Sequence, residues 1–223
     1  MTKGNKQMAI VNLTGISEDE LTRPDWGYGK SNKIMHEVLP GLWQGGTHDD
    51  DTLGNERFAR KPFITKANFD AVVTMYQYAN PAGWFVKELR YCIYDAQMDT
   101  IDLDELFATA RWAYDEWADG KRVLIRCQAG WNRSGLVTAL VLMLDGIPAT
   151  EAIDLIRHQR SENALCNPAF VAFLETLDLD LLRGKVAQIE SVKPKAEPKP
   201  KAKPKAQAKP KAEPKAKPVA KKK

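Results

Sequence analysis

The sequence predicts an α/β protein: a three-layer α/β/α sandwich around a largely parallel central sheet. Two observations predict this class. Short apolar segments rich in β-branched residues are typical of buried strands, and they alternate with longer segments whose apolar residues lie three and four positions apart, as on helices. In addition, 43% of the 223 residues are hydrophobic, so the chain is large enough to bury one core of ordinary size.

The elements are expected in a regular order. Strands are predicted at residues 69–75, 89–94 and 122–126, and helices at residues 102–117, 134–144, 150–159 and 167–177. The first helix follows an acidic turn and ends at Asp119-Gly120, whereas the second is almost wholly apolar and should be buried on all sides. Asn167 is the expected N-cap of the last helix, with Pro168 at its first position.

Three regions are expected along the chain: an irregular segment at residues 1–30, a folded domain at residues 31–185 and a basic tail at residues 186–223. Residues 193–223 hold 13 lysines, seven prolines and two glutamates, a net charge of +11. Since the whole chain carries +4, residues 1–192 carry −7. The tail has too little apolar surface to offset the entropy of ordering, so we expect disorder. It serves either to attract a polyanion such as nucleic acid or only to keep the chain soluble.

Composition also limits the class of protein. There is no apolar run long enough for a membrane span and no signal-peptide pattern, which predicts a cytoplasmic protein. Cys92, Cys127 and Cys166 are odd in number and widely spaced, so we expect reduced thiols and neither a disulfide framework nor a zinc site. The three histidines, at positions 36, 48 and 158, show no metal-site spacing and are expected to be structural or exposed. No metal or cofactor is expected.

One loop carries the pattern of a catalytic site. Cys127-Gln128-Ala129-Gly130-Trp131-Asn132-Arg133-Ser134 lies between a predicted strand and a predicted helix, where ligands bind in open α/β sheets. The five residues that separate Cys127 from Arg133 suffice to curl the backbone into a cup whose N–H groups face an anion, with Arg133 closing the ring bidentately. The same positive field favours the thiolate of Cys127. The loop therefore predicts a nucleophilic cysteine beneath a bound phosphate, with residues 128–133 as the substrate-binding residues.

The segment Val123-Leu124-Ile125-Arg126-Cys127 and the loop that follows it resemble the signature of the cysteine-dependent protein tyrosine phosphatases, most closely the dual-specificity branch in its bacterial form. The similarity extends from about residue 39 to residue 177 and implies a phosphotyrosine protein phosphatase-like fold. It also implies that Cys127 attacks phosphorus, that Arg133 binds the phosphate and that Ser134 stabilises the departing thiolate. The family usually has His before the cysteine, whereas this chain has Arg126, whose side chain should point away from Cys127 on a strand.

The same resemblance implies a general acid, an aspartate about 30 residues before the cysteine. Asp95 and Asp99 compete for this role. Asp95 is preferred because it should stand at the end of the 89–94 strand, where a side chain is better fixed than on a loop tip. Asp99 instead belongs with other acidic residues that precede a helix. Cys92, three residues before Asp95, is either a core cysteine or a redox partner of Cys127.

The function that these residues predict is hydrolysis of phosphate monoesters, most simply by a protein tyrosine or dual-specificity phosphatase acting on phosphorylated protein. Two alternatives stay open. Gly130-Trp131-Asn132-Arg133-Ser134-Gly135 also resembles the loop of RNA 5′-triphosphatases, and a lysine tail would hold RNA electrostatically. The chain could instead be a catalytically weak phosphate-binding module whose tail recruits a polyanion.

Overall fold

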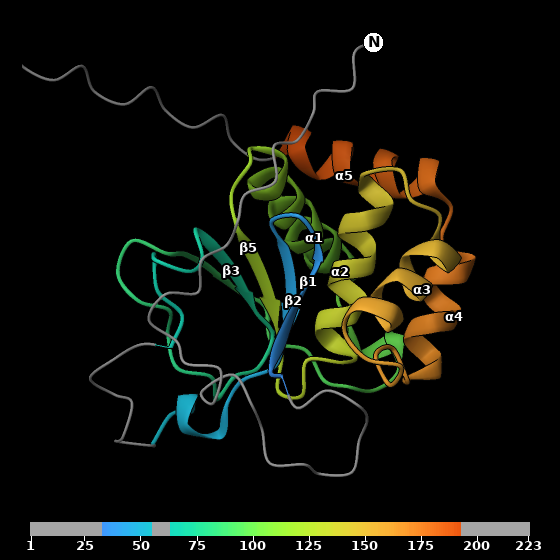
Figure 1. Ribbon diagram of the computed structural model, residues 1–223. Helices are drawn as coiled ribbons and strands as arrows, with labels where there is room; N and C mark the ends of the chain where they lie inside the picture. Colours follow the sequence, from blue (N-terminus) through green and yellow to red (C-terminus); the bar gives the residue numbers. More distant parts are fainter. Residues whose placement is uncertain (1–32, 55–62, 193–223) are drawn as a thin grey trace, which may run out of the picture. The chain divides into compact units, whose positions relative to one another are not determined.

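The computed structural model describes residues 33–54 and 63–192 (Figure 1). The described strands and helices are β1 (Met35–Leu39), β2 (Leu42–Gly45), β3 (Ala71–Thr74), β4 (Lys87–Arg90), α1 (Leu103–Ala118), β5 (Val123–Arg126), α2 (Arg133–Leu144), α3 (Ala149–Gln159), α4 (Pro168–Thr176) and α5 (Leu179–Val192). Two short 3-10 helices, η2 (Asp49–Asp51) and η3 (Met98–Thr100), lie in the connections.

The five strands form one sheet in the order β1-β2-β5-β3-β4. β5 is the central strand and pairs in parallel with β2 on one side and β3 on the other, while β4 pairs in parallel with β3. Only the β1–β2 pair is antiparallel. The carboxyl ends of β2, β3, β4 and β5 therefore meet at one edge of the sheet, and the Cys127 loop leaves from the middle of that edge. The α/β class and the largely parallel sheet predicted from the sequence are confirmed.

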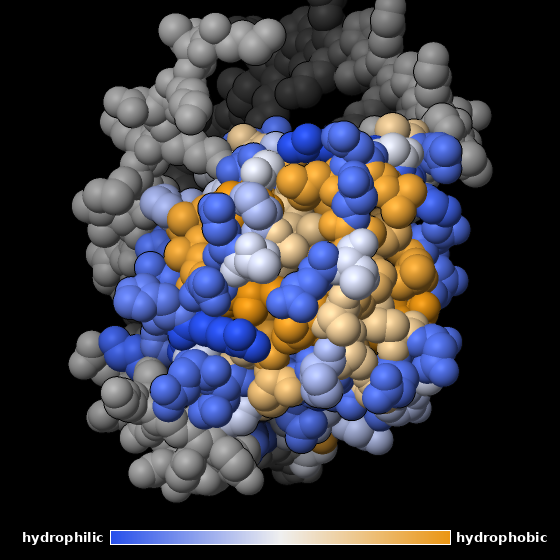
Figure 2. Space-filling view, turned by 90° about the vertical axis from the view of Figure 1, so that its right-hand side faces the viewer, coloured by the Kyte–Doolittle hydropathy of each residue, from blue (hydrophilic) through white to orange (hydrophobic). Residues whose placement is uncertain are grey.

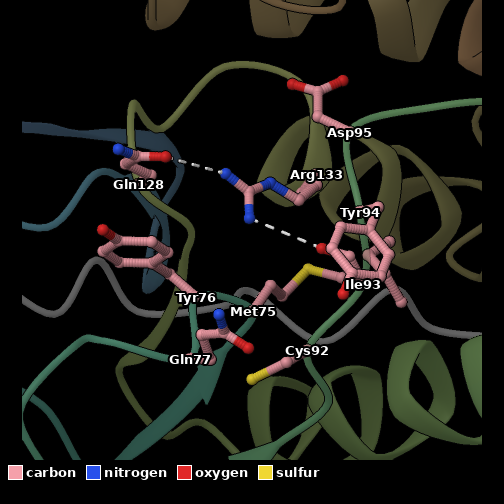
Figure 3. A pocket seen from close by; sticks show the side chains of 9 residues that line it. All are labelled: Met75, Tyr76, Gln77, Cys92, Ile93, Tyr94, Asp95, Gln128 and Arg133. Carbon is pink, nitrogen blue, oxygen red and sulfur yellow. Dashed lines mark hydrogen bonds between the residues drawn. The ribbon is translucent and has the colours of Figure 1, made fainter.

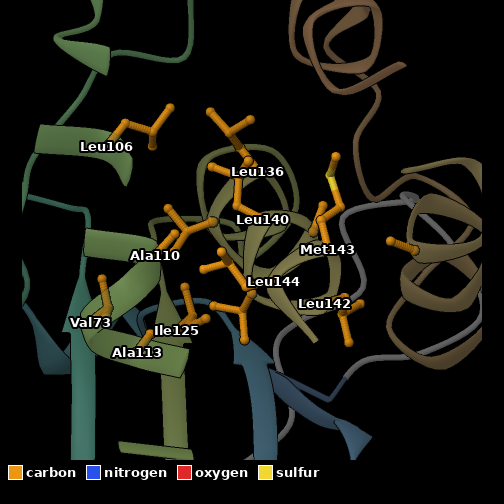
Figure 4. Packing of buried hydrophobic residues seen from close by; sticks show 14 of the residues in the cluster. Val73, Leu106, Ala110, Ala113, Ile125, Leu136, Leu140, Leu142, Met143 and Leu144 are labelled. Carbon is orange, nitrogen blue, oxygen red and sulfur yellow. The ribbon is translucent and has the colours of Figure 1, made fainter. Parts of the chain in front are cut away.

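All five α-helices contribute to one hydrophobic core on one face of the sheet (Figures 1 and 4). In α2, residues 134–143 are all buried, because α1, α3, α4 and the sheet surround the helix. α1 buries Leu106 and Ala110 against α2 and the sheet. The outer surface of this helical layer keeps apolar patches between its charged side chains (Figure 2), and Leu181 of α5 is 56% exposed.

The opposite face of the sheet has a smaller core. Trp43, Val72 and Leu124 of the sheet pack there against Phe63 and Phe69, which belong to the segment that leads into β3. Ile34, Met35 and Ile64 complete this cluster. Within the described ranges the second outer layer of the sandwich is thus a loop, because residues 63–69 supply the aromatic side chains that a second helical layer would bring.

The helix predictions agree closely with the structure. Asn167 caps α4, its side chain accepting a hydrogen bond from the N–H of Ala169 at 3.0 Å, and Pro168 takes the first position. Asp102 caps α1 through hydrogen bonds from the N–H groups of two residues in its first turn. Both caps follow from side-chain chemistry that is local in the sequence.

Two boundaries needed correction. The strand expected at 89–94 is β4, Lys87–Arg90, because the last ladder bond is made by the N–H of Tyr91 and the chain then leaves the sheet. The domain boundary expected at residue 185 is also too early, since α5 runs through Val192 and Val186 is buried in the core. The segment expected at residues 1–30 and the lysine-rich residues 193–223 lie outside the described residues. In the part of the chain that is described, no helix combines the length and the apolar character needed to cross a bilayer.

Candidate active site

The Cys127 loop links the end of β5 at Arg126 to the start of α2 at Arg133. Gly130 turns this loop with φ at 78°, a conformation that favours glycine. A Cβ at Gly130 would also collide with the backbone of Gly45 and Gly46 at the end of β2. The loop is therefore pressed against the neighbouring strand, and only glycine fits at its turn.

Polar side chains donate hydrogen bonds to the backbone carbonyl groups of the loop. The amide of Gln44 donates from Nε2 to the carbonyl of Gly130 at 3.1 Å, and the hydroxyl of Thr47 donates to the carbonyl of Cys127 at 2.9 Å. The N–H of Thr47 also donates to the carbonyl of Gln128 at 2.9 Å. Because these carbonyls are occupied on the outer side of the loop, its shape is set before any ligand arrives.

Arg160 adds a buried cation to this support. Its guanidinium, on a residue only 5% exposed, donates to the carbonyls of Ala129 and Gly130 at 3.3 and 3.2 Å. His36 lies 3.2 Å from the same guanidinium, and burial, reinforced by the charges of Arg160 and Lys33, lowers the pKa of His36 to about 4. His36 is thus a neutral structural histidine at pH 7, as expected, and Arg160 is a supporting residue that the sequence analysis missed.

Cys127 lies at the start of the loop and is 2% exposed. Its sulfur is 3.3 Å from the hydroxyl of Ser134 and 3.2 Å from the N–H of Gly130, which donates to it. Ser134 is fully buried in the first turn of α2. The sulfur thus accepts one backbone N–H and lies beside a hydroxyl group in the first turn of α2. The structure therefore brings together the two residues to which the sequence assigned the nucleophile and its stabiliser.

The guanidinium of Arg133 is only weakly bound by the protein. One Nη donates to the carbonyl of Ile93 and the other to Oε1 of Gln128, both at 3.4 Å. Nε of Arg133 is buried and has no hydrogen-bond partner among the described residues. An unsatisfied buried donor costs about 1–3 kcal/mol. An oxyanion beside Arg133 would satisfy that donor, which fits a site that binds phosphate.

A pocket of about 310 Å³ opens beside this arginine (Figure 3). Its lining consists of Met75, Tyr76, Gln77, Cys92, Ile93, Tyr94, Asp95, Gln128 and Arg133. Tyr76 and Tyr94 stand on opposite sides of the guanidinium, and the Tyr76 ring centroid is 5.7 Å from Cζ of Arg133. Cys127 is not itself part of this lining, whereas Gln128 and Arg133 of its loop are. The side chains of Gln128 and Arg133 therefore form the part of the pocket lining that belongs to the Cys127 loop.

Asp95 lies at the rim of the pocket, and two amides fix its carboxyl group. Nδ2 of Asn132 donates to one carboxylate oxygen at 2.9 Å, and Nδ2 of Asn167 donates to the other at 2.8 Å. Asn167 also donates to the carbonyl of Ala96 and thereby holds the chain around Asp95. The expected reason for its placement, the end of a strand, is wrong, since β4 ends at Arg90. Amides from the Cys127 loop and from the N-cap of α4 position Asp95 instead.

Asp99 is placed differently. It lies in the exposed 3-10 helix η3 and is not among the residues that line the pocket. Of the two candidate acids, only Asp95 contacts the loop of Cys127, through Asn132.

Asn132, Ala129 and Trp131 of the loop were also expected to bind substrate. The side chain of Asn132, expected to bind substrate, accepts the N–H of Asn167 at 3.0 Å as well as holding Asp95. Ala129 and Trp131 are half-buried, and the carbonyl of Trp131 accepts the N–H of Leu165 at 3.3 Å. Their contribution to a bound anion would come from backbone N–H groups.

Arg126 points away from the thiol, as expected. It is fully buried, and its guanidinium forms an ion pair with Asp51 at 2.7 Å and donates to the hydroxyl of Thr74 at 3.0 Å. Asp51, which is 2% exposed, was not predicted as a site residue. No signal in the sequence links two residues 75 positions apart.

The other cysteines are unpaired. Cys92 is exposed and lines the pocket, whereas Cys166 is exposed and lies 3.4 Å from Oδ1 of Asn132. No group of His, Cys, Asp and Glu within the described ranges has the arrangement of a metal site.

Comparison with known proteins identifies solved structures with a similar fold. No protein-family model matches the sequence, and no curated protein matches it. The crystal structure of DUSP15 is similar with a TM-score of 0.52 and 20% identity, over 71% of this chain and 96% of that chain. Human DUSP28 has a TM-score of 0.49 and 21% identity over 73% of this chain and 99% of that chain. A mouse putative dual specificity phosphatase complexed with zinc tungstate has a TM-score of 0.48 and 22% identity over 71% and 89%. The phosphotyrosine protein phosphatase-like fold predicted from the sequence is confirmed.

Proposed function

We propose that this chain is a phosphomonoester hydrolase of the cysteine-dependent protein tyrosine phosphatase superfamily and that its substrates are phosphorylated proteins. One observation carries the proposal. Among the described residues Arg133 has a buried Nε without a hydrogen-bond partner and makes two hydrogen bonds of 3.4 Å, and it lies six residues after a cysteine whose sulfur accepts a backbone N–H. A phosphate group would replace the weak contacts of Arg133 with bidentate, charge-assisted ones.

In the first step the thiolate of Cys127 attacks phosphorus, an S–P bond forms and the P–O bond to the leaving group breaks. Arg133 and the loop N–H groups stabilise the charge on the three phosphoryl oxygens. Asp95 gives its proton to the departing oxygen. The product is the free alcohol or phenol and a phosphocysteine on the enzyme.

In the second step water attacks the phosphocysteine and the S–P bond breaks. Asp95, now a carboxylate, accepts a proton from the water, and inorganic phosphate leaves. The hydroxyl of Ser134, 3.3 Å from the sulfur, stabilises the thiolate that is released.

The pocket favours an aryl phosphate. Tyr76 and Tyr94 form aromatic walls on either side of Arg133, and Met75 and Ile93 add apolar surface. Aromatic walls suit a flat ring such as that of phosphotyrosine. Arg133 is also the one cationic residue among the nine that line the pocket, which suits a monophosphate better than a triphosphate.

Initial rates test the proposal. A phosphotyrosine peptide, a phosphothreonine peptide and a 5′-triphosphorylated RNA are offered to the native chain and to Cys127→Ser, and acid-quenched enzyme is analysed for phosphate on Cys127 by mass spectrometry. Turnover of the phosphotyrosine peptide that disappears in Cys127→Ser supports the proposal. Faster release from RNA, falling steeply with salt, would favour the RNA phosphatase instead. Binding of phosphopeptide without turnover would indicate a phosphate-binding module.

A further inference from the structure

A buried charge cluster lies directly behind the proposed catalytic loop. Its centre is Arg126, the last residue of β5 and the neighbour of Cys127 in the chain. Its guanidinium contacts Asp51, the hydroxyl of Thr74 and the carbonyl of Asn80, and Glu88 lies 3.6 Å away. None of these contacts involves Cys127, and the proposed reaction uses none of these side chains.

Burying such a pair is costly, so its retention needs a reason. The side chains of Arg126 and Asp51 are 1% and 3% exposed. Burial raises the pKa of Asp51 and lowers the pKa of Arg126, which reflects the loss of solvation that their attraction must offset. Replacing a buried ion pair by apolar residues is often neutral or stabilising. Stability alone therefore does not explain the pair.

The contacts of the pair converge on the segment between β3 and β4. The carbonyl of Asn80 accepts a hydrogen bond from Arg126, and the N–H of Asn80 donates to the carbonyl of Asp51 at 2.9 Å. Beside them the N–H of Leu53 donates to the carbonyl of Tyr78 at 2.7 Å. The pair thus lies where two connections are tied together: residues 76–80, which follow β3, and residues 51–53, which lie between β2 and β3.

The connection between β3 and β4 forms a wall of the pocket. Tyr76 and Gln77 line it, and the Tyr76 ring lies 5.7 Å from Cζ of Arg133. Tyr78 packs edge-on against Tyr76 with ring centroids 5.6 Å apart. Arg126 is therefore joined to the nucleophile through the backbone and to the aromatic wall through Asn80.

We propose that Arg126 and Asp51 are positioning residues that hold residues 76–80 in place, so that the Tyr76 ring forms the aryl-selective wall beside Arg133. The inference rests on the proposed function for its kinetic consequence. It predicts that breaking the pair lowers activity on aryl phosphates more than on alkyl phosphates, because only an aryl group uses the wall.

The test compares two Arg–Asp pairs, one at each end of β5. Arg126→Met combined with Asp51→Leu removes the buried pair without leaving one charge unpaired. Arg122→Met combined with Asp70→Leu removes the ion pair at the opposite end of β5, where Nε of Arg122 lies 2.9 Å from Asp70, far from the pocket along the strand. Asp51→Asn serves as a second variant should the double variant fold poorly, because the amide oxygen can still accept from Arg126 and the Glu88 carboxylate, 3.6 Å away, remains as a counter-charge.

Two measurements decide the outcome. The first is the ratio of kcat/KM for a phosphotyrosine peptide to kcat/KM for a phosphothreonine peptide. This ratio is expected to fall about tenfold in the Arg126/Asp51 variant, which corresponds to about 1.4 kcal/mol of activation free energy. It is expected to stay unchanged in the Arg122/Asp70 variant. In a Tyr76→Ala background the Arg126/Asp51 change should have no further effect on that ratio, because the wall is already lost. Equal losses on both peptides, or additive effects of the two changes, would overturn the inference.

Hydrogen exchange separates this inference from the proposed function, because it needs no turnover. Backbone amides of residues 76–80 are expected to exchange faster in the Arg126/Asp51 variant and in Asp51→Asn than in the native chain, with no change in the Arg122/Asp70 variant. An enzyme without activity that still shows this pattern would refute the proposed function alone. Unchanged exchange at residues 76–80 in both variants would refute the positioning role.

Discussion

Two side-chain amides donate hydrogen bonds to the carboxyl group of Asp95, and one of them belongs to Asn167. Asn167 does not line the pocket, so a substitution there tests the position of Asp95 without changing the pocket itself. Nδ2 of Asn167 donates to Asp95 at 2.8 Å and to the carbonyl of Ala96 at 3.0 Å, while Oδ1 of the same side chain caps α4. Asn167→Ser keeps an N-cap residue, since serine is as good a cap as asparagine, and removes both donated hydrogen bonds. The variant therefore separates the placement of the acid from the stability of the helix.

The size of the effect follows from those two hydrogen bonds. A hydrogen bond to a charged group contributes about 1.5–3 kcal/mol, and exposure of this pair places it at the low end. Loss of about 1.4 kcal/mol of transition-state stabilisation is a tenfold loss of rate. We therefore expect kcat/KM to fall about tenfold on substrates with poor leaving groups, against about 10²–10⁴-fold for Asp95→Asn, which removes the acid itself.

The assay is a leaving-group series of aryl phosphates measured at constant pH. A good leaving group departs without a proton, so kcat/KM of Asn167→Ser, which reports the first step, should match the native chain on nitrophenyl phosphate and fall below it on phosphotyrosine. Asp99→Asn provides the control, because Asp99 lies in η3 and does not line the pocket. Equal losses across the series, or a loss in Asp99→Asn that exceeds the loss in Asp95→Asn, would refute this account of the acid.

Three further predictions concern the loop and the sheet. Arg133→Lys should lower kcat/KM by about 10²-fold or more, because an ammonium group cannot bind phosphate bidentately; steady-state kinetics beside a melting curve checks this, and a full loss of folding would make the comparison fail. Gly130→Ala should lower the melting temperature and abolish activity together, since its Cβ meets the backbone at the end of β2 and φ is 78°; a native melting temperature would contradict the packing. Although burial opposes it, hydrogen bonds from Arg122 and Lys66 hold the pKa of Asp70 well below its usual range. The stability that Asp70 contributes should therefore be present above about pH 4, its value in an unfolded chain, and be lost as the pH falls further, so that denaturation curves of the native chain and Asp70→Asn converge only in acid.

The sequence indicated the centre of the site because its signals there are local. A β-branched strand, a loop with Cys127, Gly130 and Arg133, and an apolar helix follow each other directly, so chain order alone determines their geometry. The N-cap at Asn167 was predictable for the same reason. A cap is a contact between residues two or three positions apart.

The surroundings of the site were not predictable because long-range contacts create them. Arg160 reaches the carbonyls of the loop 30 and 31 positions back, and Asp51 finds Arg126 across 75 positions. β1 was missed because its antiparallel pairing with β2 depends on a short hairpin and not on a strong apolar pattern. Asp95 was placed in the right region for a wrong reason, since the amides that fix it come from elements later in the chain.

The contacts that support the Cys127 loop are separate from the residues that form the aromatic side of the pocket. Gly130 against β2, with Gln44 and Arg160 on the loop carbonyls, makes the anion cup a rigid fixture that owes nothing to residues 76–80 or to Tyr94. If the proposed function holds, the aromatic side chains that flank Arg133 can therefore be replaced by other shapes while Cys127 and Arg133 keep their positions. A change of substrate would then need only substitutions outside the Cys127 loop.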